Sequence, residues 1–151
     1  MTPRPVHRRR EAGLVGGGEV LFGGVLVLIF ATMLVVNLWL IIDAKVAVSA
    51  ASREAARRIV EAGNDAGIVD AQRAAAEAVA GHHRSALRIK VSVDGKATTR
   101  CGRITVTVRS DVALVLLPLW HFTQATTQVS STHTELIDGY RSGLLGEAHC
   151  G

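Results

Sequence analysis

The chain has 151 residues, with 17 lysines and arginines against 13 aspartates and glutamates, which gives a net charge of +4. This length allows one domain beside a membrane segment. Only 4% of the residues are aromatic, which is too few for a surface that stacks nucleic-acid bases, so the positive charge does not indicate nucleic-acid binding.

The stretch from Val20 to Ile42 contains 23 residues without one charge, between Glu19 and Asp43. As a helix it would be about 34 Å long, enough to cross a bilayer core of about 30 Å. A helix in a soluble core is usually shorter, and a cleaved secretory signal has an apolar region of only about 7–15 residues. We therefore predict a helix that crosses a membrane once, in which Asn37 is the only strongly polar side chain.

The segment before this helix is basic. A single acid, Glu11, accompanies its four arginines, which are Arg4, Arg8, Arg9 and Arg10. Positive charge marks the cytoplasmic side of a membrane helix. We expect residues 1–18 to be a cytoplasmic basic segment, residues 19–42 to cross the cell membrane, and the chain after them to lie outside. Orientation and contact with anionic lipid account for the arginines, so we predict a lipid partner and no nucleic acid.

Residues 43–62 favour a continuation of the same helix, because they are rich in Ala and contain neither Gly nor Pro. Val46 and Ala50 fall near one face of small residues. This face packs either against other membrane helices or, as in an ordinary amphipathic helix, against the chain's own domain. Gly63 suits the C-terminal cap of a helix, and a second helix is expected over residues 66–80.

The apolar period then changes to 2, which predicts strands. Residues 87–93 and 104–109 alternate apolar and polar side chains, and Asp94-Gly95 between them is a turn signal. A last strand is expected over residues 124–136. The predicted fold class is α+β: a long N-terminal membrane helix, a short second helix and an antiparallel sheet of three or four strands.

The exported domain is expected over residues 43–140, followed by a flexible tail over residues 141–151, which is rich in glycine. Within the domain, Val112 to Trp120 is a second apolar run, too short to span a bilayer. Burial statistics favour a strand or loop in the core. The alternative is a segment that rests on the outer membrane–water interface, with Trp120 as its anchor.

Cys101 and Cys150 both follow the membrane helix, on the side where a disulfide can form. Their spacing matches no metal motif, and two unpaired thiols are the alternative to a disulfide. No His-x-x-x-His pattern for zinc is present among His82, His83, His121, His133 and His149. A nucleophile elbow, a phosphate-binding loop and a dinucleotide fingerprint are also absent from the sequence. We therefore predict no enzyme, cofactor or metal.

The order of features resembles the TadE-like family of pseudopilins, which belong to tight-adherence (Flp-type) pilus systems. That order is a basic segment, a glycine-rich step, one Glu, an apolar helix, an Ala-rich helix and a small sheet. The likeness is strongest over residues 13–58, where Ser52-Arg53-Glu54-Ala55-Ala56-Arg57 is similar to the family's Ala-Arg-Glu-Gly-Ala-Arg segment, with Ala55 where Gly is common. The resemblance implies a structural role: a minor pseudopilin or assembly accessory of such a pilus or of a related secretion machine. Its partners would be other pilin-like or pilus-assembly membrane proteins.

The resemblance also implies a role for Glu19. A prepilin peptidase cuts pilin-like proteins after a Gly and leaves a Glu as the fifth residue, where it pairs with a neighbour's N-terminal amine. In this chain, a cut after Leu14 would make Glu19 fifth, whereas a cut after Gly13 would make it sixth. Either the changed register is tolerated or the protein remains uncut, with Glu19 paired to the arginine segment. As a local feature, Glu19 at the start of the apolar helix would also suit the helix dipole.

Two other functions stay open at this stage. The chain could be a membrane-anchored extracellular binding module without a pilus role, or an exported enzyme. A pilin-like role needs Val25, Ala31, Val46 and Ala50 to meet other subunits, whereas an anchor does not. An enzyme needs a cleft with perturbed acids or histidines, and the sequence contains no such cluster.

Overall fold

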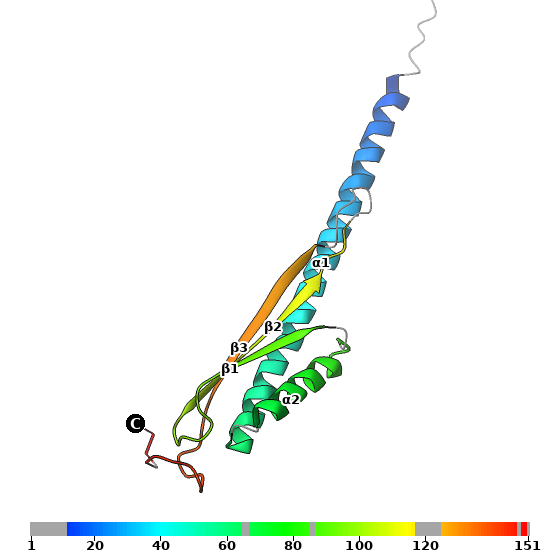
Figure 1. Ribbon diagram of the computed structural model, residues 1–151. Coiled ribbons are helices and arrows are strands. Elements are labelled where there is room, and N and C mark those ends of the chain that lie inside the picture. The colour runs from blue at the N-terminus through cyan, green and yellow to red at the C-terminus, as the bar shows by residue number, and fades with distance from the viewer. Residues whose placement is uncertain (1–11, 65–66, 85–86, 117–124, 148, 151) are drawn as a thin grey trace, which may run out of the picture. The chain divides into compact units, whose positions relative to one another are not determined.

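The computed structural model describes residues 12–64, 67–84, 87–116, 125–147 and 149–150. Five elements follow one another (Figure 1): α1 (Ala12–Ala62), α2 (Gly67–Gly81), β1 (Ile89–Asp94), β2 (Arg103–Ala113) and β3 (Thr126–Leu136). The strands form one antiparallel sheet in the order β1-β2-β3. The predicted α+β class, with a long helix, a short helix and a small antiparallel sheet, is confirmed. The chain divides into two units, one up to Val36 and one from Asn37 onward.

Helix α1 begins earlier than the sequence indicated. It starts at Ala12 and includes Gly16–Gly18, although glycine is a poor helix former. Nucleating a helix is costly, whereas extending one adds a hydrogen bond per residue. The glycines can therefore continue a helix that they would start badly. The first turn of α1 contains no acidic residue, so the interpretation of Glu19 as a partner of the helix dipole is wrong.

In the second unit, α1 packs against its own domain. The buried side chains of this part of the helix are small or of moderate size: Ala44, Ala47, Val48, Ala51, Ser52, Ala55, Ala56 and Ile59. All of them except Ala47 and Ser52 share one core with Ile104, Val106 and Val108 of β2 and with Ala71, Ala75 and Val79 of α2. Of the two predicted partners for the small-residue face, the chain's own domain is therefore the one observed. Val46 is 50% exposed and does not belong to the buried face.

The end of α1 and the start of α2 are capped by local groups. Gly63 adopts a left-handed φ of 64°, and its N–H donates to the Ile59 carbonyl at 3.0 Å. The Asn64 side-chain oxygen accepts the Gly67 N–H at 3.2 Å, as an N-cap residue does. These caps turn the chain from α1 into α2, close to the predicted break.

The sheet places one row of side chains in the core and the opposite row in solvent. On the solvent face, the hydroxyls of Thr105 and Thr134 lie 3.0 Å apart, and those of Thr107 and Thr132 lie 2.9 Å apart. On the inner face, β3 presents Ser131, whose hydroxyl accepts a hydrogen bond from buried Ser52 of α1 at 3.3 Å. The edge strand β3 is therefore held to α1 by a polar contact beside the apolar core.

The apolar run from Val112 to Trp120 divides between two environments. Strand β2 includes Val112, which is buried, so the core interpretation is confirmed at that residue. It is wrong for Val115 and Leu116, which are 48% and 41% exposed. Pro118, Trp120 and the rest of residues 117–124 lie outside the described part of the chain.

The C-terminal tail was expected to have no fixed structure, but its described residues make specific contacts. The Leu145 carbonyl accepts a hydrogen bond from the Arg100 N–H at 2.8 Å, and the Leu145 N–H donates to the Thr98 carbonyl at 3.2 Å. The Arg141 guanidinium donates to the carbonyls of Val60 and Glu61 at the end of α1. Backbone pairing, the arginine cap and the packing of Leu144 against the hydrophobic core therefore hold the tail in place.

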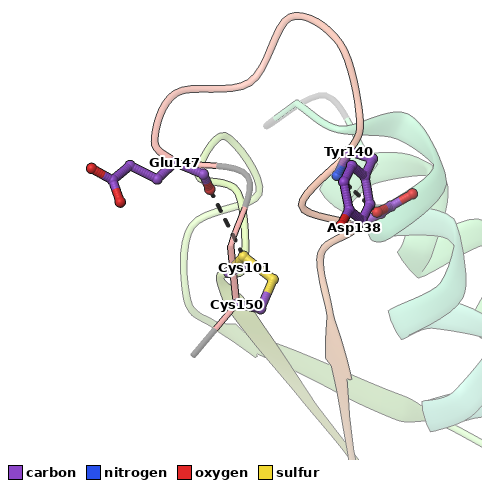
Figure 2. Close-up of a disulfide and its surroundings, with 5 residues drawn as sticks. All are labelled: Cys101, Asp138, Tyr140, Glu147 and Cys150. Carbon is purple, nitrogen blue, oxygen red and sulfur yellow. Dashed lines mark hydrogen bonds between the residues drawn. A yellow bond between two sulfur atoms is a disulfide. The ribbon is translucent and has the colours of Figure 1, made fainter.

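The two cysteines are joined. Cys101 and Cys150 form a disulfide with a Cα–Cα distance of 5.2 Å, within the usual range. Figure 2 shows the bond linking the tail to the segment between β1 and β2, near Glu147. Cys101 has a φ of 56°, a conformation that is uncommon for a residue with a side chain. Of the two states left open by the sequence, the structure contains the disulfide.

Candidate functional site

The first unit presents an apolar surface that no other described part of that unit covers. Helix α1 is long and apolar enough to cross a membrane: its most apolar window has a mean hydropathy of 2.8 and contains no buried residue. Val20, Phe22 and Leu28 are 76%, 72% and 66% exposed. A soluble protein rarely exposes so many large apolar side chains together. This surface is the main candidate functional site of the chain.

The residues singled out for processing and assembly lie along the start of α1. Gly13 and Leu14 are in its first turn, and Glu19 follows two turns later with an exposed side chain. The arginines expected to orient the helix, Arg4 to Arg10, lie outside the described residues. Whether the chain is cut near Leu14 therefore stays a prediction.

A pilin-like helix should differ from a plain anchor in that four of its residues meet other subunits, and three of these four residues are exposed. Val25 is 49% exposed and Val46 is 50% exposed. Ala31 is also exposed, while Ala50 is half-buried. Each therefore has surface left for a neighbouring molecule, as the pilin-like role requires.

Asn37 joins the apolar helix to the segment that follows β2. Its side-chain amide donates to the Val115 carbonyl at 2.9 Å, and its oxygen accepts the Val115 N–H at 2.8 Å. One asparagine thus satisfies both backbone groups of a residue 78 positions away. Asn37 could be singled out in the sequence as the one strongly polar residue of the apolar stretch, but its partner could not be predicted.

An ion pair lies at the polar end of the apolar stretch. The Arg84 Nε atom is 2.6 Å from Asp43 Oδ2, and a second guanidinium nitrogen is 3.5 Å from the Leu40 carbonyl. The two side chains are 21% and 39% exposed, respectively. Two residues further on, Lys45 donates to the Ser130 carbonyl of β3. These contacts fasten the domain to α1 where its apolar residues end.

A second set of charges surrounds the C-terminal end of α1. The Arg57 Nε atom donates to Glu61 Oε1 at 2.8 Å. This hydrogen bond, and then the attraction between the charges, raises the pKa of Arg57 and lowers the pKa of Glu61. An open groove beside the pair is lined by Arg58, Asp70 and Arg73. Arg58 and Arg73 already pair with Glu54 and Asp70, as exposed charges commonly do.

Among the described residues, no group of three or more His, Cys, Asp or Glu side chains is placed to hold a metal ion. Comparisons with protein-family models, with curated proteins and with solved structures find no match to this chain. The likeness to the TadE-like pseudopilins therefore remains an expectation from sequence.

Proposed function

We propose that this protein is a single-pass membrane protein of the pilin-like class, acting as a minor pseudopilin or assembly accessory of a tight-adherence pilus or a related secretion machine. Its work in this proposal is structural. Helices pack side by side in the membrane, and the exported domain contacts the other components. No reaction, cofactor or nucleic acid enters this role.

One observation carries the proposal: the bare apolar surface of α1 from Val20 onward. Burying apolar area is worth about 25 cal/mol per Å², so a helix with residues such as Phe22 72% exposed needs lipid or other helices around it. The second half of α1 differs, because its small residues are already used by its own sheet. The exposed first part of α1 can contact lipid and other helices, while its second part is covered by its own domain. This division is expected of a membrane anchor that also packs against partner proteins.

The direction of insertion has two supports. The arginines before α1 favour a cytoplasmic N-terminus. The disulfide between Cys101 and Cys150 suits an oxidising compartment on the other side of the membrane. A fluorescent reporter that matures only in the cytoplasm, fused after the last residue, is expected to stay dark. A bright signal would reverse this orientation.

Glu19 tests the assembly role. A carboxylate near the lipid edge is costly unless it is paired, and a neighbour's amine or the arginine segment would pair it. We expect Glu19→Ala to insert normally in the membrane but to lose co-purification with its partner proteins after crosslinking. Glu61→Ala, which removes another exposed acid of the same helix, is the matched control and is expected to keep them. If Glu19→Ala assembles normally, Glu19 has no role in assembly.

The intact mass and N-terminal sequence of the protein, purified from its native membrane, distinguish the two main functions. A mature start at Leu14 or Val15 means that a prepilin peptidase has processed the chain, which supports the pseudopilin. A start at Met1 means an uncut anchor and favours the accessory role or the alternative, a membrane-anchored extracellular binding module. A binding module of this kind should also keep its function when Val25 and Ala31 are substituted by residues that block helix packing.

A further inference from the structure

We infer that Val115 and Leu116, which follow β2, make a second membrane contact: they rest in the outer leaflet of the bilayer and are held there by Asn37. The occupant of this surface is lipid, at the boundary between headgroups and acyl chains. The inference depends on the proposed membrane insertion of α1, and it adds a contact made by the exported domain.

The depth of the segment follows from the helix. Asn37 comes six residues before Asp43, and the five residues between them are all apolar. At about 1.5 Å per residue, Asn37 lies about 9 Å from Asp43 along the helix axis. Because Asn37 holds the Val115 backbone at 2.8 and 2.9 Å, Val115 lies at the same level. Interfacial segments bury their apolar face by about 5–10 Å, which is a similar depth.

The side chains around this level are those of a membrane interface. Trp39, between Asn37 and Asp43, is 71% exposed, and tryptophan is enriched where headgroups meet acyl chains. Leu38 and Ile42 are 50% and 59% exposed on the same helix. With Val115 and Leu116, they form an exposed apolar end of the second unit. The Asp43–Arg84 ion pair marks its polar limit.

The hydrogen bonds explain how irregular backbone can stay at this depth. Away from water, each unpaired N–H or C=O costs several kcal/mol, so non-helical backbone in a bilayer must find partners in the protein. Asn37 supplies both partners for Val115, and the Leu114 N–H donates to the Ala125 carbonyl at 2.8 Å. The one strongly polar side chain of the apolar stretch thus has a specific use at this place.

The test uses the full chain in vesicles of phosphatidylcholine and phosphatidylglycerol, with an environment-sensitive fluorophore on single introduced cysteines. Leu116→Cys reports the proposed contact, Val25→Cys reports the membrane helix, and Gln128→Cys on the solvent face of β3 reports water. The native cysteines are held in their disulfide and do not react without reductant. Emission is measured with brominated acyl chains, which quench from lipid, and with iodide, which quenches from water.

We expect the labels at positions 116 and 25 to shift to the blue and to be quenched by brominated lipid, and the label at 128 to be quenched by iodide. If position 116 behaves like 128 while position 25 is in lipid, this inference fails and the membrane helix stands. If all three labels are in water, the proposed membrane insertion fails as well. A label at 116 shielded from both quenchers while position 25 is in lipid would overturn the lipid contact and indicate a protein partner.

A second variant tests the role of Asn37. Asn37→Leu removes the partner of Val115 and is expected to move the 116 label from lipid quenching toward iodide quenching. Thr32→Val is the matched control, because the Thr32 hydroxyl donates to the Leu28 carbonyl of its own helix; this variant is expected to leave the label unchanged. An unchanged 116 label in Asn37→Leu would show that Asn37 does not hold the segment in the membrane.

Discussion

The disulfide offers the most direct test of how the exported domain is stabilised. Cys101 and Cys150 are separated by 49 positions, so the bond closes a loop of about 50 residues in the unfolded chain. In the chain-entropy treatment, a loop of this size loses about 14 cal/mol/K, which corresponds to about 4 kcal/mol of stability at 25 °C. We expect reduction of the disulfide to lower the free energy of unfolding of the sheet by about this amount.

The assay is amide hydrogen exchange of the full chain in detergent micelles, followed by mass spectrometry of a peptide that covers β2. This central strand is paired on both sides and should exchange only when the sheet opens. A loss of about 4 kcal/mol predicts exchange about a thousandfold faster after reduction. In the double variant Cys101→Ser, Cys150→Ser, the β2 peptide should exchange at the rate of the reduced protein, and adding reductant should not change that rate. A change of less than about tenfold would refute the reasoning, because the loop would then contribute under about 1.4 kcal/mol.

Three further changes test the packing and the charges. Gly95→Ala should lower stability by about 1–3 kcal/mol in urea denaturation, since φ is 108° and the new Cβ would lie 2.2 Å from the Arg103 carbonyl oxygen. Ile59→Ala should cost about 2–5 kcal/mol in the same assay, because this side chain is fully buried; a loss under 1 kcal/mol would contradict the assigned core. Arg57→Ala should return the lowered pKa of Glu61 toward its ordinary range in a carbon-13 NMR titration. The stabilisation by this exposed pair is present above the ordinary glutamate pKa and fades as the pH falls through the lowered pKa of Glu61. Arg57→Ala should therefore be less stable than the natural chain at neutral pH and equally stable below that lowered pKa.

The elements could be predicted because each has a short-range signal. The apolar stretch, the Ala-rich continuation and the change of period to 2 located both helices and the three strands, although α1 starts at Ala12 and not at the predicted residue 19. What short-range patterns could not provide were contacts between distant residues. The bonds of Asn37 to Val115, Arg84 to Asp43 and Arg141 to the end of α1 join positions that are 41 to 81 residues apart.

The errors have the same origin. The second apolar run was assigned to the core by composition, but whether Val115 or Leu116 is covered depends on which surface the segment meets after β2 ends. The tail was expected to be free because it is rich in glycine, yet one arginine, one backbone pairing and one disulfide fasten it. Contacts between distant residues decided both cases, and such contacts cannot be read from composition.

The change in side-chain size along α1 shows how one helix can serve two surroundings. Before Asp43 the exposed residues are large, among them Phe22 and Trp39, and large apolar side chains gain most from transfer into lipid. After Asp43 the buried residues are mainly alanines, which allow a sheet to approach the helix closely. Replacing the buried alanines after Asp43 with large residues would therefore displace the sheet. Replacing large residues of the first unit, such as Phe22, with Ala would weaken insertion and leave the sheet intact. This separation makes the two halves of the helix independent targets for testing anchoring and domain folding.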